Sequence, residues 1–430
     1  MKKVLIISYY WPPSGGSGVQ RWLKQVKYLR DYNWEPVVFT ADNGELPVLD
    51  PSFQKDIPKN IEIIRFPIWE PYNLYKKIAN KNKNFEPGLI AKASSGSFLE
   101  RISVFIRGNF FIPDARMFWI KPASKFIKEY LCKNHIDAII STGPPHTTHM
   151  IAMDVKKDTD IPWIADFRDP WTKIDFYTKL KLTKWADRKH RELESQVITK
   201  SDKVVTVSWK WASDFKKEYN RDVDVITNGY DEDDFKNIRI NLNNKFNILH
   251  CGVMKENRNP VVLWEVLNHI CKENKYFANS LSIDIVGNCD DEIIKSIKKN
   301  NLVDKLKMFP YVPHDEITTI MASSQVLLLS IERTNDSHGI IPGKLYEYIA
   351  SERPVLAIGP SNADSSKIIQ QTNSGQFFEF EDFEGVKNFV QEAYENFLNG
   401  NLYGSSNNEI KKFSRKKLTE DFANLLDSIS

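Results

Sequence analysis

The sequence predicts an α/β protein made of two doubly wound domains, each built on a parallel sheet. Three observations lead to this prediction. The chain has 430 residues, whereas one domain takes roughly 100–200 residues. Short apolar runs, typical of parallel strands that are buried on both faces, alternate with helix-length segments. This alternation stops near Asp224 and then starts again.

The first series begins with the apolar run 4–8, followed by a Pro/Gly-rich loop and a helical stretch from Val19 to Tyr32. Four more strand-like runs follow, separated by helix-length segments: VVFT (37–40), IEIIRF (61–66), DAIIST (137–142) and PWIADF (162–167). Residues 68–111 interrupt the pattern with interleaved aromatic and basic residues. Such an insertion fits contact with a membrane face and a lipid-linked substrate, or a solvated helical excursion whose aromatic residues pack on the domain.

The second series has five strand-like runs: NILHCG (247–252), SIDIVG (282–287), KMFPYV (307–312), QVLLLS (325–330) and PVLAIG (354–359). The acidic, Asn-rich stretch from Asp231 to Asn244 suits a linker. We therefore expect an N-terminal domain over 1–225 and a C-terminal domain over 226–408. A helical segment over 409–430 could pack on either domain, including back on the N-terminal one.

Charge and cysteine content exclude several classes of protein. Lys and Arg number 59 and Asp and Glu 56, giving a net charge of +3, and this near balance argues against a nucleic-acid binder. The four cysteines form no CxxC pair, so neither a zinc site nor a disulfide framework is expected and a reducing cytosol fits. The apolar run at the N-terminus is too short for a signal peptide. We expect a cytoplasmic protein, at most peripheral at the inner face of the membrane.

The loop after the first strand, WPPSGGSGVQR (11–21), is a candidate ligand loop. Gly15 and Gly16 let the backbone pass close to a ligand, and the helix that follows offers amides to an anion. The loop is not a dinucleotide fingerprint, because Arg21 stands where the third glycine belongs. It could equally be only a tight turn.

Two further segments follow strands, where α/β sheets place their ligands. In STGPPHTTHM (141–150), His146 could contact a sugar hydroxyl or an emerging charge, or could be a plain surface or capping residue. In ADFRDPW (165–171), Asp166 and Asp169 could receive sugar hydroxyls or a proton. An Asp–Arg pair made with Arg168 could instead only fix the loop.

The most informative stretch is SIERTNDSHGIIPGKLYEYIASERPVLAIG (330–359). Gly343 opens a helix that starts at Lys344, and such a helix start suits a diphosphate through its backbone N–H groups. Lys344 adds a positive charge. Glu347 lies three residues further on the same helix face and can reach a ribose diol, or is an ordinary helix carboxylate.

Two other segments agree with a nucleotide site. HCGVMKENRNP (250–260) places Gly252 at a strand end and Arg258 beyond it, suited to neutralising a diphosphate leaving group. YVPHDEI (311–317) starts a helix whose backbone could bind a base. The Asp-x-Asp triplets at 158–160, 222–224 and 231–233 lie in polar turns, so no metal site is expected from them.

Together these features resemble the retaining glycosyltransferases of family 4, which have the GT-B fold. The resemblance spans essentially the whole chain and includes ITNGYDEDDF (226–235) and the GKLYEYIASERPVLA helix. It implies two Rossmann-like domains facing across a cleft. A nucleotide-diphosphate sugar of UDP or GDP type would bind the C-terminal domain and a glycan or lipid-linked acceptor the N-terminal one, without a metal or another cofactor.

The resemblance also implies roles for single residues. Glu347 corresponds to the ribose-binding carboxylate, and the diphosphate contacts correspond to Gly252, Arg258, Lys344 and the helix start at Gly343. Gly15 and Gly16 correspond to the loop that closes over the phosphates, and His146 to the histidine at the sugar. The family usually has another glutamate eight positions before Glu347, where this chain has Gly339.

We therefore predict a glycosyltransferase that retains anomeric configuration and acts in cell-surface polysaccharide synthesis. Arg258 and Lys344 would stabilise the leaving diphosphate, whose oxygen takes the acceptor proton, while His146 and Asp169 would serve the reacting sugar. A nucleotide-sugar 2-epimerase of the same fold is an alternative. A non-catalytic sugar-nucleotide-binding subunit is another, which Gly339 favours.

Overall fold

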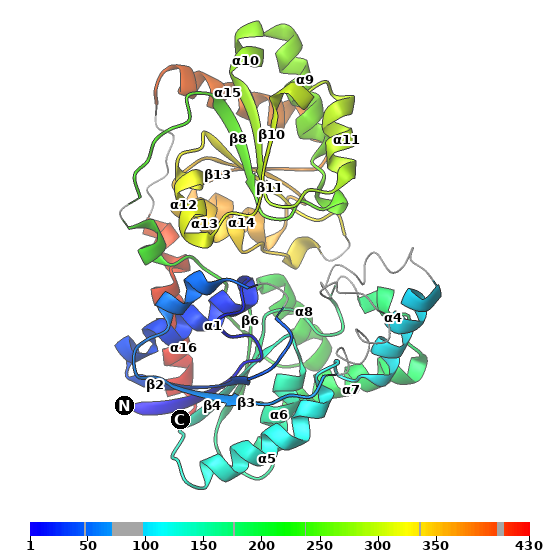
Figure 1. The fold of residues 1–430 in the computed structure, drawn as a ribbon, viewed down its shortest axis with the longest axis vertical. Coiled ribbons are helices and arrows are strands. Elements are labelled where there is room, and N and C mark those ends of the chain that lie inside the picture. The colour runs from blue at the N-terminus through cyan, green and yellow to red at the C-terminus, as the bar shows by residue number, and fades with distance from the viewer. Residues whose placement is uncertain (47–48, 71–97, 175–176, 237, 335–336, 402–407) are drawn as a thin grey trace. The chain divides into compact units, whose positions relative to one another are not determined.

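The structure, a computed structural model, describes residues 1–46, 49–70, 98–174, 177–236, 238–334, 337–401 and 408–430. The chain divides into two compact units (Figure 1). The first unit comprises Met1–Thr227 and Leu418–Ser430, and the second comprises Asn228–Lys417. The division lies just before the stretch from Asp231 to Asn244, which belongs to the second unit.

The first unit contains a seven-stranded parallel sheet in the order β3-β2-β1-β4-β5-β6-β7. Its strands are β1 (Lys2–Ile7), β2 (Trp34–Ala41), β3 (Glu62–Phe66), β4 (Ala138–Gly143), β5 (Trp163–Phe167), β6 (Lys203–Thr206) and β7 (Asp224–Val225). Its helices are α1 (Ser17–Tyr28), α4 (Phe98–Phe110), α5 (Ile120–Leu131), α6 (Thr147–Lys156), α7 (Lys184–Lys200) and α8 (Trp209–Tyr219). Most of α16 (Arg415–Asp427) also belongs to this unit.

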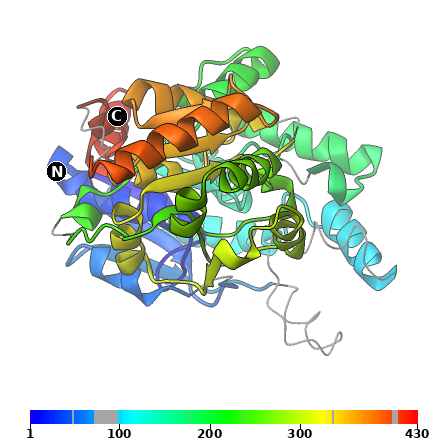
Figure 2. The ribbon, with the colours of Figure 1, turned by 90° about the horizontal axis from the view of Figure 1, so that it is seen from above.

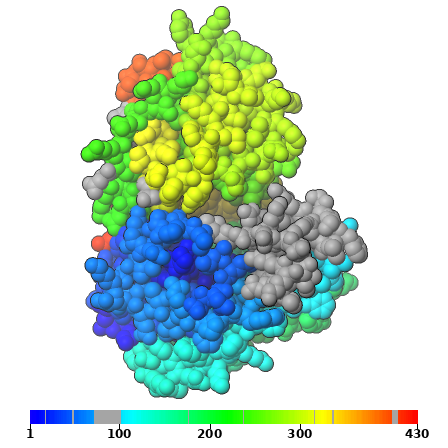
Figure 3. All heavy atoms as spheres, viewed as in Figure 1, coloured from blue at the N-terminus to red at the C-terminus, as the bar shows by residue number. Residues whose placement is uncertain are grey.

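Helices cover both faces of this sheet, because successive strand residues point to opposite faces. In β1, Val4 and Ile6 pack with α1 and α16, whereas Leu5 and Ile7 pack with α5, α6 and α7 (Figure 1). Helix α5 is amphipathic, with Ala123 and Ile127 buried and Lys125 exposed. The outer face of α5 is part of the cyan surface of this unit in Figure 3.

The second unit contains a six-stranded parallel sheet in the order β10-β9-β8-β11-β12-β13. Its strands are β8 (Phe246–Cys251), β9 (Leu281–Val286), β10 (Leu306–Phe309), β11 (Val326–Ser330), β12 (Val355–Ile358) and β13 (Gly375–Phe378). On one face lie α9 (Val261–Glu273), α10 (Lys275–Ser280), α11 (Asp291–Lys299) and α15 (Phe383–Leu398), with α9 and α15 side by side (Figure 2). On the other lie α12 (His314–Ala322), α13 (Lys344–Ala350) and α14 (Asp364–Thr372).

Two doubly wound parallel sheets are therefore confirmed, and all ten strand-like runs of the sequence form strands. Three strands were not predicted, namely β6, β7 and β13. These strands are two to four residues long, which is too short for a hydrophobic period to stand out. In each sheet the direction of winding reverses between two central strands, β1 and β4 in the first unit and β8 and β11 in the second. Ligands of such sheets bind beyond the carboxyl ends of these strands.

The predicted insertion at 68–111 is only partly covered, because residues 71–97 lie outside the described residues. Within the described part, α4 leaves large apolar side chains exposed at Ile102, Phe105, Ile106 and Phe110. No helix in the described part of the chain is long and apolar enough to cross a bilayer.

Candidate functional site

The carboxyl end of β8 in the second unit is built for close approach. Gly252 follows the strand with a φ of 96°, a conformation that side chains other than glycine rarely adopt. The neighbouring Gly287 is needed because a Cβ there would lie 3.0 Å from the carbonyl oxygen of Gly252. Helix α13 is tied to this strand end, since the backbone N–H of Cys251 donates to the buried hydroxyl of Tyr348 at 3.0 Å.

Lys344, the first residue of α13, brings its ammonium to this strand end. Its Nζ lies 3.0 Å from Nε2 of His250 in β8, and a Cβ at Gly252 would be 3.5 Å from the same nitrogen. Burial, together with the nearby positive charge of Arg258, lowers the pKa of Lys344 to about 7. Among the described residues, no carboxylate comes within ion-pair distance of this ammonium.

Arg258 lies beyond β8 in a short 3-10 turn, Glu256–Arg258. Its Nε donates to Oε1 of Glu332 at 2.9 Å, and its Nη2 contacts the same oxygen. The Glu332 side chain is 8% exposed and the Arg258 side chain 21%. Glu332 therefore holds the guanidinium beside Lys344, and its carboxylate is already engaged by a cation.

Glu347 lies one turn after Lys344, and its carboxylate is engaged by a histidine. Oε1 of Glu347 is 2.9 Å from Nε2 of His314, the first residue of α12. On the other side of the same ring, Nδ1 of His314 is 3.9 Å from Oδ2 of Asp234. An Asp–His–Glu series therefore fixes the Glu347 carboxylate next to the cations.

The start of α13 offers less to an anion through its backbone than the sequence predicted. The helix has only seven residues, so its dipole is small. The N–H of Leu345 donates to the carbonyl of Pro342 at 3.0 Å, and that of Tyr346 to the carbonyl of Gly343 at 3.2 Å. These two amides are occupied by carbonyls of the same turn, and the side chain of Lys344 adds a basic group at this helix start.

In the first unit, His146 lies between β4 and α6 and is almost completely buried. Its ring stacks on the indole of Trp171, with centroids 4.5 Å apart and an interplanar angle of 1°. Among the described residues its Nδ1 has no hydrogen-bond partner. Burial, with the neighbouring His149 and His190, lowers the pKa of His146 well below its usual range. The ring is therefore neutral and is held by stacking.

The ring of Trp171 is fixed in turn by groups of α7. Its indole N–H donates to Nδ1 of His190 at 3.0 Å, and its backbone N–H donates to Oε1 of Glu194 at 3.1 Å. Burial raises the pKa of Glu194. No role was predicted for these three residues, although Trp171 ends the ADFRDPW segment.

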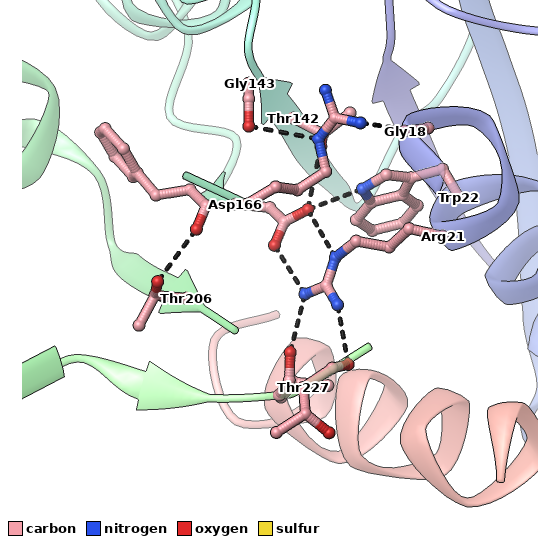
Figure 4. Close-up of polar contacts among 11 residues, drawn as sticks. Gly18, Arg21, Trp22, Thr142, Gly143, Asp166, Thr206 and Thr227 are labelled. Carbon is pink, nitrogen blue, oxygen red and sulfur yellow. Dashed lines mark hydrogen bonds and ion pairs between the residues drawn. The ribbon is translucent and has the colours of Figure 1, made fainter. Parts of the chain in front are cut away.

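Asp166 and Arg168 have structural roles (Figure 4). Asp166 is fully buried and accepts hydrogen bonds from Arg21, from the indole of Trp22 at 2.7 Å and from Thr142 at 2.9 Å. Arg168 donates to backbone carbonyls, those of Gly18 at 2.8 Å, Gly143 at 3.2 Å and Pro144. The ion pair of Asp166 is thus made with Arg21 of α1, and Arg168 fixes the loops through backbone carbonyls.

The remaining predicted residues of the first unit lie in the same two loops. Gly16 is exposed with a φ of 94°, and nothing lies within 4 Å of where its Cβ would be. Gly15 is buried, and Asp169 is half-buried directly after Arg168. A Cβ at Gly18 would lie 2.4 Å from Nη1 of Arg168, so a larger residue there would displace the guanidinium. The glycine loop is thus tied to the end of β4 through Arg168.

The structure brings the predicted residues of the second unit together: Gly252, Arg258, Gly343, Lys344 and Glu347. Sequence reasoning missed their partners His250, Glu332 and His314. Each of these lies inside one of the candidate segments, but a contact between residues 33 to 94 positions apart has no local signal.

Comparisons with known proteins place the chain among glycosyltransferase structures. No protein-family model matches the sequence. One curated relative, a probable glycosyltransferase named WbjE from Pseudomonas aeruginosa, is 32% identical over 89 residues. This match covers 20% of the chain and 22% of the relative, so the chain matches only about a fifth of the relative's length.

Solved structures match over the full length. Sucrose-phosphate synthase (tll1590) from Thermosynechococcus elongatus has a TM-score of 0.63 and 12% identity, covering 100% of this chain and 99% of its own. Anabaena HepE, solved in complex with UDP-glucose, also has a TM-score of 0.63, with 11% identity and 100% of both chains covered. The sheet orders and these similarities show that the chain has the GT-B fold of glycosyltransferases, two Rossmann-like α/β units.

Proposed function

We propose that the protein is a glycosyltransferase that takes a sugar from a nucleotide-diphosphate donor and transfers it with retention of configuration. One observation carries the proposal. At the carboxyl end of β8, the guanidinium of Arg258 and the amino group of Lys344, which an anion would hold protonated, lie with the Glu347 carboxylate at a glycine-lined strand end. Two cations suit a diphosphate, and a carboxylate suits a ribose diol. The UDP-glucose in the HepE structure supports a donor of this class.

The chemistry then follows from where charge develops. As the bond to the sugar breaks, negative charge grows on the leaving diphosphate, and Arg258 and Lys344 stabilise it. The departing phosphate oxygen takes the proton of the acceptor hydroxyl, so no strong protein base is required. In the first unit, His146 corresponds to the histidine at the sugar that the resemblance to family 4 implies, and the proposed role of Asp169, to receive a sugar hydroxyl, follows from its place after a strand. The neutral state of the His146 ring is compatible with a hydrogen bond to a sugar hydroxyl.

The acceptor is proposed to be a glycan or a lipid-linked glycan of cell-surface polysaccharide synthesis, reached at the membrane face. The exposed apolar side chains of α4, with the exposed Arg101 on the same helix, support contact with an anionic lipid surface. Sedimentation with vesicles of anionic and of neutral lipid tests this contact, and failure to bind anionic vesicles at low salt would contradict it.

The donor is tested by a thermal-shift screen of nucleoside diphosphates and their sugar conjugates, because a ligand of the folded state raises the melting temperature. UDP, GDP, UDP-sugars and GDP-sugars are compared with the free nucleosides. A rise in melting temperature with the diphosphates or their sugar conjugates, but not with the nucleosides, supports the proposal. An equal rise with the nucleosides contradicts it. Incubation with the donor alone separates an epimerase, which converts the donor without an acceptor, from a glycosyltransferase. Donor binding without turnover across many acceptors would indicate the non-catalytic binding subunit.

Arg258→Ala should lower kcat about 100-fold or more while KM for the donor changes less, because the guanidinium acts mainly on charge that appears in the transition state. Steady-state kinetics with the donor identified by the screen measures this. Arg333→Ala is the matched control, since Arg333 lies in the loop after β11, is exposed and pairs with Glu381 at 2.7 Å. Unchanged turnover in Arg258→Ala would remove the leaving-group role.

A further inference from the structure

One contact at the end of β8 has no part in the function proposed so far. His250 is 1% exposed, and its two ring nitrogens face different partners. Nδ1 lies 3.2 Å from the backbone carbonyl of Leu328 in β11, and Nε2 lies 3.0 Å from Nζ of Lys344. The ring therefore connects the two central strands of the second sheet to the first residue of α13.

The partners of the ring fix its protonation state. A carbonyl oxygen only accepts hydrogen bonds, so Nδ1 carries the hydrogen and donates it to Leu328. Nε2 then has a lone pair, which accepts a hydrogen from the Lys344 amine or ammonium. Burial and the nearby Lys344 lower the pKa of His250 well below its usual range, in agreement with a neutral ring.

A neutral acceptor is the kind of partner that an anion site needs at this point. A carboxylate would cancel the charge of Lys344 and repel phosphate oxygens, whereas an imidazolium would repel the ammonium. The other charged and titratable groups near Lys344 are Arg258 beyond β8, the thiol of Cys251 in β8 and Glu347 on α13. Neutral His250 orients the Lys344 ammonium without neutralising its charge.

We propose that His250 is a positioning residue for diphosphate recognition. Its neutral imidazole holds the Lys344 nitrogen at the end of β8, where this nitrogen binds a nucleoside diphosphate. The inference rests on the proposed function, because it concerns the same donor site. His250 acts through Lys344 and does not touch the ligand. Removing His250 should therefore have no effect on diphosphate affinity once Lys344 is gone.

A double-mutant cycle tests this dependence. The affinities of UDP and GDP, and of uridine and guanosine as probes without phosphates, are measured by calorimetry for the full-length wild type, His250→Phe, Lys344→Met and the double variant. We expect His250→Phe to weaken the diphosphate that binds the wild type about tenfold, with little change for the nucleoside. The double variant should be no weaker than Lys344→Met. Additive losses, or equal losses for nucleoside and diphosphate, would overturn the proposal.

His250→Gln is the conservative variant, since its side-chain amide oxygen can accept from Lys344 where Nε2 does now. It should keep affinity within about threefold of the wild type and supplies the test if His250→Phe does not fold. Loss of diphosphate binding in a folded His250→Gln variant equal to that of Lys344→Met would contradict the role of the acceptor. A wild type that binds neither UDP nor GDP would remove the proposed function and this inference together. Wild-type binding with additive losses would remove the inference alone.

Discussion

Lys344 is a residue whose charge is unfavourable in the free protein. Its pKa is lowered from 10.5 to about 7, and each unit corresponds to about 1.4 kcal/mol. The side chain keeps some exposure, so the cost of its charge is smaller than the full shift implies. A diphosphate would offset this cost, because an anion beside the ammonium favours the protonated form. Binding should therefore take up a proton above pH 7, and affinity should fall as pH rises.

The same residue gives a prediction for stability. Below pH 7 both the folded and the unfolded chain hold the proton, so the burial cost is fully present. Between pH 7 and pH 10.5 only the unfolded chain holds it, so the stability of the wild type rises with pH. The stability of Lys344→Met relative to the wild type should thus fall by about 1–3 kcal/mol between pH 7 and pH 10.

Chemical denaturation at several pH values without ligand measures this difference. The lost hydrogen bond to His250 adds an offset that does not change with pH, so the slope carries the test. Lys387→Met is the control. Like Lys344, Lys387 contacts a histidine, His269, at 3.1 Å, but unlike Lys344 it has a carboxylate within ion-pair distance, that of Glu273 at 4.0 Å. A pH-independent difference for Lys344→Met would contradict the lowered pKa.

The proposed contact of Glu347 with a ribose can be tested through the ligand. If its carboxylate binds a ribose diol, removal of one sugar hydroxyl should weaken the wild type, since hydrogen bonds to charged groups contribute about 1.5–3 kcal/mol. UDP or GDP should therefore bind roughly ten times more tightly than the 2′-deoxy or the 3′-deoxy analogue. Glu347→Ala should bind all three alike and weakly. Calorimetry gives the ratios, and a variant that still discriminates would exclude this role.

At the scale of elements, the Asp166 network joins α1, β4 and β5 and reaches the carbonyls of Ile226 and Thr227 through Arg21. The side chains of Arg21 and Asp166, which form an ion pair, are both 0% exposed. Burial works against the charged carboxylate, but Arg21 and the other donors lower the pKa of Asp166 overall. Removing one partner of such a pair leaves a buried charge without compensation, which costs about 3–5 kcal/mol.

Asp166→Asn should therefore destabilise the first unit by about that amount. Hydrogen exchange at the amides of β4 and β5 measures the loss as reduced protection. The control is Asp214→Asn, at the surface pair with Lys210, where less than about 1 kcal/mol is expected. Equal protection in the two variants would show that Asp166 does not hold these elements together.

Local sequence patterns predicted most of the strands and part of the site. The ten strands and the helix that starts at Lys344 follow from local patterns, because a buried parallel strand and a helix start leave a signal in a few consecutive residues. The site residues Lys344, Arg258 and Glu347 were found for the same reason. Their partners His250, Glu332 and His314 were not, because each contact joins loops or strand ends that only the sheet order brings together.

For Asp166, the sequence could not separate a catalytic from a structural role. A carboxylate after a strand in an α/β fold suggests chemistry as readily as structure. Only the four hydrogen bonds around it, from residues up to 145 positions away, assign it to the framework. Asp169, three residues on, keeps its predicted role as a proposal.

At the scale of the whole molecule, the order of the chain and the order of the cores differ. Residues 418–430 follow the entire second unit in sequence, yet they supply part of the core of the first. Phe422 of α16 is fully buried, its ring lies 5.1 Å from that of Trp22, and Arg21 lies over it at 5.3 Å. The first unit thus cannot finish its core before the second unit has been synthesised.

Phe422→Ala tests this arrangement, because truncating a buried phenylalanine costs about 3–5 kcal/mol. Although the substitution lies beyond the second unit in sequence, hydrogen exchange followed by mass spectrometry should show lower protection in α1, β1 and β4 and unchanged protection in β8 and β11. Phe277→Ala is the reciprocal control, since Phe277 is fully buried in the core of the second unit, and it should show the opposite pattern. Two cores that each open alone give these separate losses, whereas equal loss of protection in both units for either variant would mean that the chain unfolds as one.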